Sequence, residues 1–201
     1  MIVAGNIGAG KTTLARILSR HFGWWIGGES VEDNPYLSDF YADMSRWSFH
    51  LEVYFLGHRA NLHRTASERP EGAVLDRSIY EDREIFANAM HEKGFLSDRD
   101  LYAYDSLYRM IARTLPQPDL IIYLTAPVDV LCDRIRRRGL GFDRDVSAEY
   151  LAMIERFYRR WIDHAPTGRV IEVDSTKADF AHDDAKDGEL GKMIRLIESA
   201  T

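Results

Sequence analysis

The sequence predicts an α/β fold in which a parallel five-stranded sheet carries helices on both of its faces. Short apolar runs alternate along the chain with longer segments of helical periodicity. The short runs are apolar at consecutive positions, which is typical of strands that are covered on both faces. The 201 residues contain no internal repeat, low-complexity tract or proline- and glycine-rich linker, so we expect residues 1–201 to form a single domain.

The predicted elements alternate in a regular order. Strands are expected at residues 2–4, 24–26, 73–75, 120–124 and 170–173. A helix follows the first strand, because apolar residues recur at helical spacing from Leu14 to Phe22. Further helices are expected at residues 44–65, 80–91, 98–114, 128–138, 147–164 and 179–199. Parallel sheets bind ligands beyond the carboxyl ends of their strands, so the residues after each strand are the first candidates for a site.

Composition limits the kinds of partner that we expect. The net charge of −6 argues against a general surface for nucleic acid or anionic membranes. No apolar stretch approaches the roughly 20 residues that span a bilayer, and the first residues lack a secretory pattern. Cys132 is the only cysteine, so no internal disulfide forms, and we expect it to be a small core residue. A cytoplasmic protein is expected.

The segment that follows the first predicted strand has the pattern of a phosphate-binding loop. It reads Gly-Asn-Ile-Gly-Ala-Gly-Lys-Thr and fits G-x-x-x-x-G-K-[ST] without a mismatch. Backbone amides and a helix N-terminus would face the phosphates, Lys11 would add positive charge, and the Thr12 hydroxyl would hold Mg²⁺. The expected ATP-binding residues of this P-loop are Gly5, Asn6, Ile7, Gly8, Ala9, Gly10, Lys11, Thr12 and Thr13.

The rest of the sequence indicates which class of P-loop protein this is. The Asn-Lys-x-Asp guanine signature of GTPases does not occur in the sequence. ATPase motors need a longer chain and an apolar run that ends in paired acids. We therefore expect a P-loop kinase fold, in which the γ-phosphoryl group moves to a small acceptor.

Acidic residues follow the second and third predicted strands, where an acceptor would bind. Glu29 stands where a general base for an acceptor hydroxyl is needed, although a solvated loop acid remains an alternative. Asp76 can reach Mg²⁺, and Arg77 can neutralise charge on the transferred phosphoryl group. Alternatively, Asp76 caps the helix that follows it, and Arg77 pairs with Asp76 on the surface.

The helix predicted at residues 44–65 carries a second polar pair. Glu52 and Arg59 are seven residues apart and share one face of the helix. Aromatic and aliphatic residues surround Glu52, and a carboxylate in that setting must be paired or hydrogen-bonded. The pair suits a pocket for a flat heterocycle, or else a structural Glu–Arg network.

Arginines accumulate near the helix predicted at residues 128–138. Arg134 and Arg138 are four residues apart, and a glycine-containing loop follows them. Such a segment can close over a triphosphate and open when the product leaves. We expect an arginine-rich lid over about residues 134–146, although the charges also suit a helix C-terminus.

Several of these segments together resemble the deoxynucleoside kinase family. They are "GNIGAGKTTL", "ESV", "RWSFHLEVYFLGHR", "DRSIYEDREIFA" and "RIRRRGLGFDRDVSAEYL", and they run from Ile2 to about Tyr158. The resemblance implies transfer of a phosphoryl group from ATP, with Mg²⁺, to the 5′-hydroxyl of a deoxynucleoside. It also implies a homodimer joined through helices, for which residues 101–110 offer a face, unless they form an ordinary core helix.

The resemblance also implies roles for residues near the acceptor. Glu29 matches the acid of the family's Glu-Pro-Val motif, with Ser30 in place of the proline, and Asp76 and Arg77 match the acid-Arg-Ser motif. Either acid can be the proton acceptor. Tyr41 and Asp143 match the residues that hold the 3′-hydroxyl of the sugar. Arg59 and Asp82 match the pair that faces the base, and Arg134 and Arg138 match the lid arginines around the phosphates. Asp179 and Phe180 fall near the loop that meets the donor base, with a shift of one residue.

One position departs from many family members, which have glutamine where this chain has Glu52. An ionised glutamate only accepts hydrogen bonds, so it suits adenine, guanine and cytosine, whose edges donate. Thymine presents one donor between two carbonyls. We therefore expect deoxyadenosine or deoxyguanosine to be preferred over deoxycytidine, with thymidine a poor substrate.

Two alternatives to a deoxynucleoside kinase remain at this point. A nucleoside-monophosphate kinase resembling thymidylate kinase shares the loop and the lid, but it needs extra cations for the phosphate of its acceptor. A non-catalytic ATP-binding sensor has no need of both strand-end acids and the lid arginines.

Overall fold

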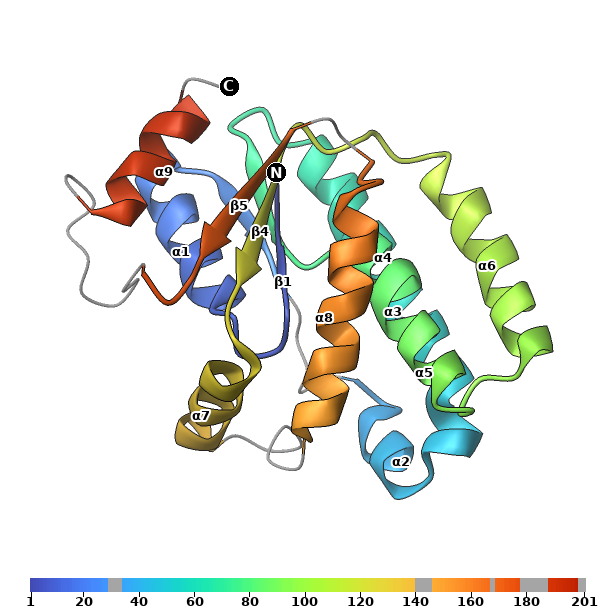
Figure 1. Cartoon of the computed structure of the whole chain (residues 1–201). Coiled ribbons are helices and arrows are strands. Elements are labelled where there is room, and N and C mark those ends of the chain that lie inside the picture. The colour runs from blue at the N-terminus through green and yellow to red at the C-terminus, as the bar shows by residue number, and fades with distance from the viewer. Residues whose placement is uncertain (29–33, 140–145, 167–168, 178–187, 199–201) are drawn as a thin grey trace.

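The computed structural model describes residues 1–28, 34–139, 146–166, 169–177 and 188–198 (Figure 1). Five strands form one parallel sheet in the order β2-β3-β1-β4-β5. They are β1 (Ile2–Gly5), β2 (Trp25–Gly27), β3 (Ala73–Asp76), β4 (Ile121–Thr125) and β5 (Val170–Asp174). The predicted five-stranded parallel sheet is therefore confirmed, and each strand lies within one residue of its predicted bounds.

Helices cover both faces of the sheet (Figure 1). They are α1 (Lys11–Phe22), α2 (Leu37–Ala42), α3 (Met44–Ser67), α4 (Ile79–Glu81), the π-helix η1 (Asp82–Ala87), α5 (Asn88–Glu92), α6 (Asp98–Ala112), α7 (Val128–Arg138), α8 (Ala148–Ile162) and α9 (Glu189–Glu198). Helices α1 and α9 lie on one side, and α3, α4, α5 and α8 lie on the other, with α6 outside them. None of the described helices is long and apolar enough to cross a membrane.

Two hydrophobic cores form because successive strand residues point to opposite faces of the sheet. In β4, Ile121 and Tyr123 belong to the core under α3 and α8. Ile122 and Leu124 of the same strand belong to the core under α1, α7 and α9. Burial of each such side chain contributes roughly 1.5–3 kcal/mol. Cys132, on α7, is half-buried against the second core and not fully inside it as predicted.

The helical segment after β3 differs from its prediction. The sequence predicts one continuous helix at residues 80–91, whereas the structure contains a π-helical turn at Asp82–Ala87 between α4 and α5. A π-turn holds an extra residue, which rotates the side chains that follow it. Apolar periodicity does not reveal such a local insertion.

Two further differences concern short or terminal elements. Helix α2 was not predicted, because six residues are too few to establish a helical period. At the C-terminal end, the predicted helix over residues 179–199 corresponds to α9 at Glu189–Glu198. The first part of that predicted range lies outside the described residues.

The carboxyl ends of the strands gather at the end of the sheet where α2 and α7 lie (Figure 1). There β1 passes directly into the P-loop at Gly5, which has a φ of 145°. A Cβ atom at this position would lie 2.6 Å from the Leu124 carbonyl oxygen of the adjacent strand. Glycine is therefore required for β1 and β4 to pair up to the start of the loop.

Candidate active site

The P-loop connects β1 to α1 and is closed by short hydrogen bonds. Gly8 and Gly10 have φ values of 81° and 98°, and Gly10 precedes the first residue of α1. These left-handed conformations turn successive backbone amides toward one side, as an anion-binding loop requires. Lys11 is buried, and its Nζ donates to the Asn6 carbonyl oxygen at 2.9 Å. The ammonium group therefore lies inside the loop.

Asn6 attaches the P-loop to α8. Its Nδ2 donates to the Leu151 carbonyl oxygen at 2.9 Å, and its Oδ1 accepts from the Ile7 amide at 2.8 Å. Asn6 is buried, so these bonds are shielded from water. The shape of the loop is thus coupled to the helix that follows the predicted lid.

Asp76 and Thr12 meet where β3 ends beside the P-loop. Thr12 Oγ1 donates to Asp76 Oδ2 at 2.5 Å, although 64 residues separate the two. The parallel pairing of β1 with β3 places Val3 opposite Asp76, which brings this carboxylate to the loop. A hydroxyl and a carboxylate are the oxygen ligands that Mg²⁺ accepts beside phosphate oxygens and water. The pair therefore fits a magnesium ion.

Arg77 has an unusual backbone conformation. Its φ is 73°, the only positive value for a non-glycine residue among the described parts of the chain. Its amide donates to the Val3 carbonyl oxygen at 3.2 Å, and its guanidinium lies 4.4 Å from the centre of the Phe86 ring. A left-handed arginine is strained, so surrounding contacts must hold it in place.

Glu52 and Arg59 lie on the inward face of α3, as their spacing predicts. Each is only 4% exposed. Arg59 forms an ion pair with Asp82 of η1, which is also buried. The guanidinium of Arg59 lies 4.7 Å from the Phe55 ring centre. The structure thus brings together the three residues predicted to face the base.

The predicted lid residues have different environments. Arg134 donates to Ser175 Oγ at 2.8 Å, to the Ser175 carbonyl oxygen at 2.7 Å and to the Gly8 carbonyl oxygen at 3.4 Å. It therefore joins α7 to the P-loop and to the end of β5. Arg138 is exposed in the last turn of α7, before Gly139. Residues 140–145, which include Asp143, lie outside the described residues.

The remaining predicted site residues are either partly exposed or lie outside the described residues. Tyr41 lies on α2 and is partly exposed, with its ring against Phe40. Glu29, Asp179 and Phe180 lie outside the described residues. Among those described, no cluster of three or more histidine, cysteine, aspartate or glutamate side chains could hold a metal ion.

Comparison with known protein families shows which family this chain belongs to. The sequence model of the family "Deoxynucleoside kinase" matches residues 1–197. The chain belongs to the deoxynucleoside kinase family. It is therefore an enzyme that phosphorylates a deoxynucleoside, and the expectation from its motifs is confirmed.

Individual relatives of the kinase act on different bases. The chain is 38% identical over 184 residues to a deoxyadenosine/deoxycytidine kinase of Bacillus subtilis, covering 90% of this chain and 85% of the relative. It is 36% identical over 182 residues to a deoxyguanosine kinase of the same organism, covering 89% and 87%. The structure of a deoxyadenosine kinase from M. mycoides with products bound superposes with a TM-score of 0.81 at 25% identity, covering 98% of each chain. The P-loop kinase fold is thereby confirmed.

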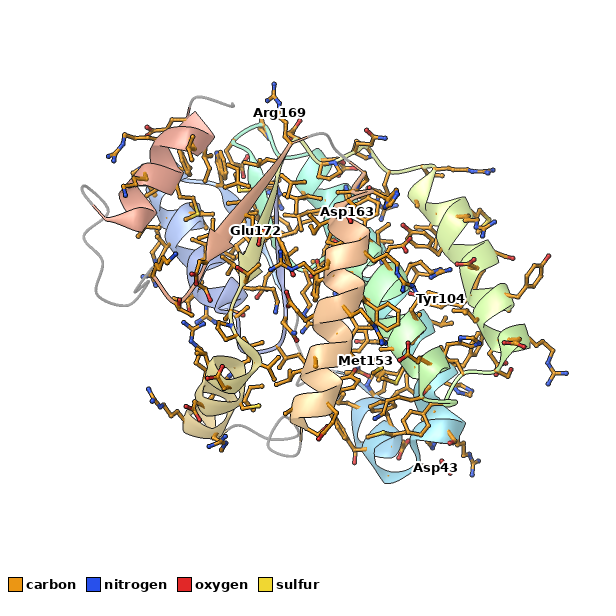
Figure 2. All side chains as sticks on the ribbon, in the orientation of Figure 1. Asp43, Tyr104, Met153, Asp163, Arg169 and Glu172 are labelled. Atoms are coloured by element: carbon orange, nitrogen blue, oxygen red, sulfur yellow. The ribbon has the colours of Figure 1, made fainter. Side chains whose placement is uncertain are left out.

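Sequence reasoning missed two tyrosines beside the acceptor residues of this kinase. Tyr104 of α6, labelled in Figure 2, is fully buried, and its hydroxyl has no hydrogen-bond partner among the described residues. Burial, with Asp82 and Glu52 nearby, raises the pKa of Tyr104 well above its ordinary value. Burial also raises the pKa of Tyr150 on α8, and Glu52 adds to this effect. Both residues lie in segments that the sequence analysis singled out, but nothing in those patterns marks either tyrosine as part of the site.

Sequence reasoning also missed Glu81, a carboxyl group that is 0% exposed. It accepts a hydrogen bond from Tyr158 of α8 at 2.7 Å and one from Ser78 at 3.1 Å. Burial raises the pKa of Glu81, whereas the charges of Arg77 and Lys11 lower it. The Ser-x-x-Glu spacing in the sequence is a helix-capping signal, so it gave no reason to place this acid inside the protein.

Proposed function

We propose that this kinase transfers the γ-phosphoryl group of ATP to the 5′-hydroxyl of a purine deoxynucleoside. The 5′-oxygen attacks the γ-phosphorus, the bond to ADP breaks, and the hydroxyl proton passes to a carboxylate. Asp76, at the end of β3, and Glu29 are the two candidates for that carboxylate. The products are ADP and a deoxynucleoside 5′-monophosphate for nucleotide salvage.

In this proposal, the P-loop and the residues at the strand ends bind the phosphates and neutralise their charge. Residues 5–13, with Lys11, bind the triphosphate, and Arg77 neutralises charge on the transferred group. Arg134 and Arg138 belong to the lid on the donor side. Thr12 and Asp76 would hold Mg²⁺, which lowers the charge repulsion between the phosphates and the attacking oxygen.

The preference for purines is carried by the buried carboxylate of Glu52 beside the Arg59–Asp82 ion pair. An ionised carboxylate accepts hydrogen bonds, and adenine N6 and guanine N1 and N2 donate them. Thymine would place a carbonyl oxygen against the carboxylate. Two buried hydrogen-bond acceptors that face each other without a donor are costly. Relatives named for deoxyadenosine and deoxyguanosine are consistent with a purine acceptor, and the Bacillus subtilis deoxyadenosine kinase is also named for deoxycytidine.

The sugar is held, in this proposal, by Tyr41 and Asp143, which would bind the 3′-hydroxyl. A neutral acceptor fits the acidic and aromatic character of this side of the site. Extra cations for an acceptor phosphate, which a nucleoside-monophosphate kinase needs, are not among the residues assigned to the acceptor.

Acceptor-dependent release of ADP tests the proposed reaction. The purified kinase with Mg²⁺ and ATP is expected to release ADP when deoxyadenosine or deoxyguanosine is added, and mass spectrometry should detect the 5′-monophosphate. The matched control is 2′,5′-dideoxyadenosine, which lacks the attacking hydroxyl and should inhibit without releasing ADP. Equal ADP release with and without a deoxynucleoside would overturn the proposal.

We also propose that the kinase forms a homodimer through α6. Three large apolar side chains project from the outer side of this helix: Tyr102, which is 76% exposed, Met110, which is 61% exposed, and Leu107. The exposed ring of Tyr102 and the thioether of Met110 are costly in water and typical of interfaces. Tyr104 of α6 is fully buried and contributes to the core instead.

A further inference from the structure

Arg134 on α7 forms hydrogen bonds to two separate segments beyond the carboxyl ends of the strands. Its Nη1 donates to Ser175 Oγ at 2.8 Å, and its Nη2 donates to the Ser175 carbonyl oxygen at 2.7 Å. Nη1 also donates to the Gly8 carbonyl oxygen of the P-loop at 3.4 Å. Because two nitrogens of one rigid plane bind the same residue, the direction of the guanidinium is fixed. One side chain thus joins α7, the P-loop and the end of β5.

Ser175 belongs to a well-ordered turn at residues 174–177. Ser175 is buried, and its amide donates to the Thr125 carbonyl oxygen at 2.8 Å, which extends the pairing of β5 with β4. Asp174 Oδ1 accepts from the amide of Thr176 at 2.9 Å and from its hydroxyl at 2.6 Å. Such bonds from an aspartate to the residue two positions later are typical of a tight turn. The turn is therefore closed by its own residues, and Arg134 attaches it to α7.

Helix α7 is itself packed directly against the P-loop. A Cβ atom at Gly8 would lie 3.2 Å from Ile135 Cγ1 and 3.2 Å from the Leu131 carbonyl oxygen. The Leu131 and Ile135 side chains are buried in the core that they share with α1. The backbone of the loop therefore contacts α7 next to Arg134. Because α7 is fixed on the P-loop, the hydrogen bonds of Arg134 also fix the turn relative to that loop.

The order of the strands places this turn on the donor side of the proposed reaction. Asp76 and the acceptor residues lie at the end of β3, on one side of β1, whereas β4 and β5 lie on the other side. In phosphoryl transfer, the attacking and leaving oxygens are roughly in line through the phosphorus. The ADP part of the donor must therefore point away from β3 and toward β4 and β5. The turn after β5 borders that side of the P-loop.

We propose that Arg134 is a positioning residue for the donor nucleotide, whose guanidinium holds the turn at residues 174–177 against the P-loop as one wall of the site for the ATP nucleoside. The planar fork of the side chain performs this role, and its positive charge alone does not. The resemblance implies that Arg134 contacts phosphates, whereas this inference assigns it contacts with protein. The inference rests on the proposed transfer from ATP, because that reaction defines the donor side.

The variant Arg134→Lys tests the inference, because lysine keeps the charge but has a single nitrogen in place of the fork. We expect the KM for ATP to rise about tenfold, as after loss of hydrogen bonds to a charged group. The kcat and the KM for the deoxynucleoside should stay within about twofold, since the acceptor and the transition state are unaffected. The matched control Arg20→Lys, on the exposed side of α1, should leave all three values unchanged.

Two results with Arg134→Lys would overturn the inference. A KM for ATP within about twofold of the wild type would show that a positive charge suffices, as for a side chain that only contacts phosphates. A fall in kcat of more than about tenfold with an unchanged KM for ATP would place Arg134 at the transferred phosphoryl group instead.

The variant Ser175→Ala approaches the same contact from the turn and changes no charge. It removes one of the two hydrogen bonds to Ser175, so the KM for ATP should rise about threefold to fivefold at a normal kcat. Adding it to Arg134→Lys should change the KM by less than about twofold more. An unchanged KM in Ser175→Ala, or effects that multiply in the double variant, would overturn the inference. The control Ser67→Ala, which removes an exposed hydroxyl at the end of α3, should behave as the wild type.

Circular dichroism shows whether each variant is folded. If Arg134→Lys does not fold, Ser175→Ala decides alone: a raised KM for ATP at normal kcat supports the inference, and a wild-type KM overturns it. An active wild type with a normal KM for ATP in both variants overturns the inference and leaves the proposed function standing. A wild type without deoxynucleoside-dependent ADP release overturns the proposed function, and the inference with it.

Discussion

The Thr12 hydroxyl donates a hydrogen bond to the Asp76 carboxylate, with 2.5 Å between the two oxygen atoms. Parallel pairing of β1 and β3 makes this contact possible, because it places the last residue of β3 beside the loop that follows β1. The contact brings the proposed magnesium ligands together from segments that are 64 residues apart. In the proposed reaction, this carboxylate is one of the two candidates for accepting the proton of the attacking hydroxyl.

Replacement of Asp76 by asparagine is expected to lower kcat by about a hundredfold or more, because both metal binding and proton acceptance need the carboxylate. Steady-state ADP release over a magnesium titration measures this effect. The control Asp133→Asn removes an exposed carboxylate that pairs with Arg136 on α7. Its kcat should be normal. An Asp76→Asn variant with wild-type kcat and wild-type magnesium dependence would remove Asp76 from the mechanism.

Replacement of Glu52 by glutamine is expected to change the choice of base. Glutamine can donate as well as accept, so thymidine should gain relative to deoxyadenosine by about tenfold in kcat/KM, equivalent to about 1.4 kcal/mol. The ratio is measured with each deoxynucleoside separately. Glu68→Gln, at the exposed end of α3, should leave the ratio unchanged. If Glu52→Gln also leaves it unchanged, Glu52 does not contact the base.

The Arg59–Asp82 pair is expected to contribute strongly to folding. Arg59→Met leaves the buried Asp82 without its main counterion, so the free energy of unfolding should fall by about 3–5 kcal/mol in urea titrations. Adding Asp82→Leu should recover much of this loss, because both charges are then absent. The control Arg64→Met, on the exposed side of α3, should change stability by less than about 0.5 kcal/mol. A small effect of Arg59→Met would show that the pair is not buried in solution.

Glu81 should make the stability of the kinase depend on pH. Burial raises the pKa of Glu81 in the folded state, so the folded protein binds more protons than the unfolded chain above the ordinary pKa of about 4.3. The contribution of Glu81 to the free energy of unfolding therefore decreases as pH rises through the folded-state pKa. Glu81→Gln removes this decrease, so the variant should gain stability relative to the wild type as pH rises. Urea titrations at several pH values measure the difference, and a constant difference would contradict the prediction.

Charged substitutions on α6 test the proposed dimer face. Tyr102→Glu combined with Met110→Glu should convert a dimer into a monomer, because two carboxylates would be buried at the interface. Light scattering after size-exclusion chromatography measures the mass. The control Arg16→Glu reverses an exposed charge on α1, which lies on the other face of the sheet from α6. A wild-type monomer at high concentration would contradict the proposal.

The sequence predicted those features that depend on local pattern. Consecutive apolar residues predict strands covered on both faces, the P-loop matches a fixed spacing, and a separation of seven residues places Glu52 and Arg59 on one helical face. These follow from the geometry of single elements. The cytoplasmic location, the roles of Glu29 and Asp143 and the donor-side roles of Arg134 and Arg138 stay predictions.

Features that depend on distant neighbours could not be predicted. Glu81 meets Tyr158 across 77 residues, and an acid in a predicted amphipathic helix normally faces water. The π-turn that begins at Asp82 shifts the direction of later side chains, and a periodic pattern is too coarse to detect one added residue. Tyr104 and Tyr150 reach the acceptor residues only because α6 packs against α3 and η1, and because α8 packs against η1.

Competition among the four deoxynucleosides tests the central claim most directly. The wild-type kinase receives an equimolar mixture of deoxyadenosine, deoxyguanosine, deoxycytidine and thymidine with limiting ATP and Mg²⁺, and mass spectrometry follows the four monophosphates. The account predicts that deoxyadenosine or deoxyguanosine monophosphate accumulates first and thymidine monophosphate last. Earliest accumulation of thymidine monophosphate would contradict it.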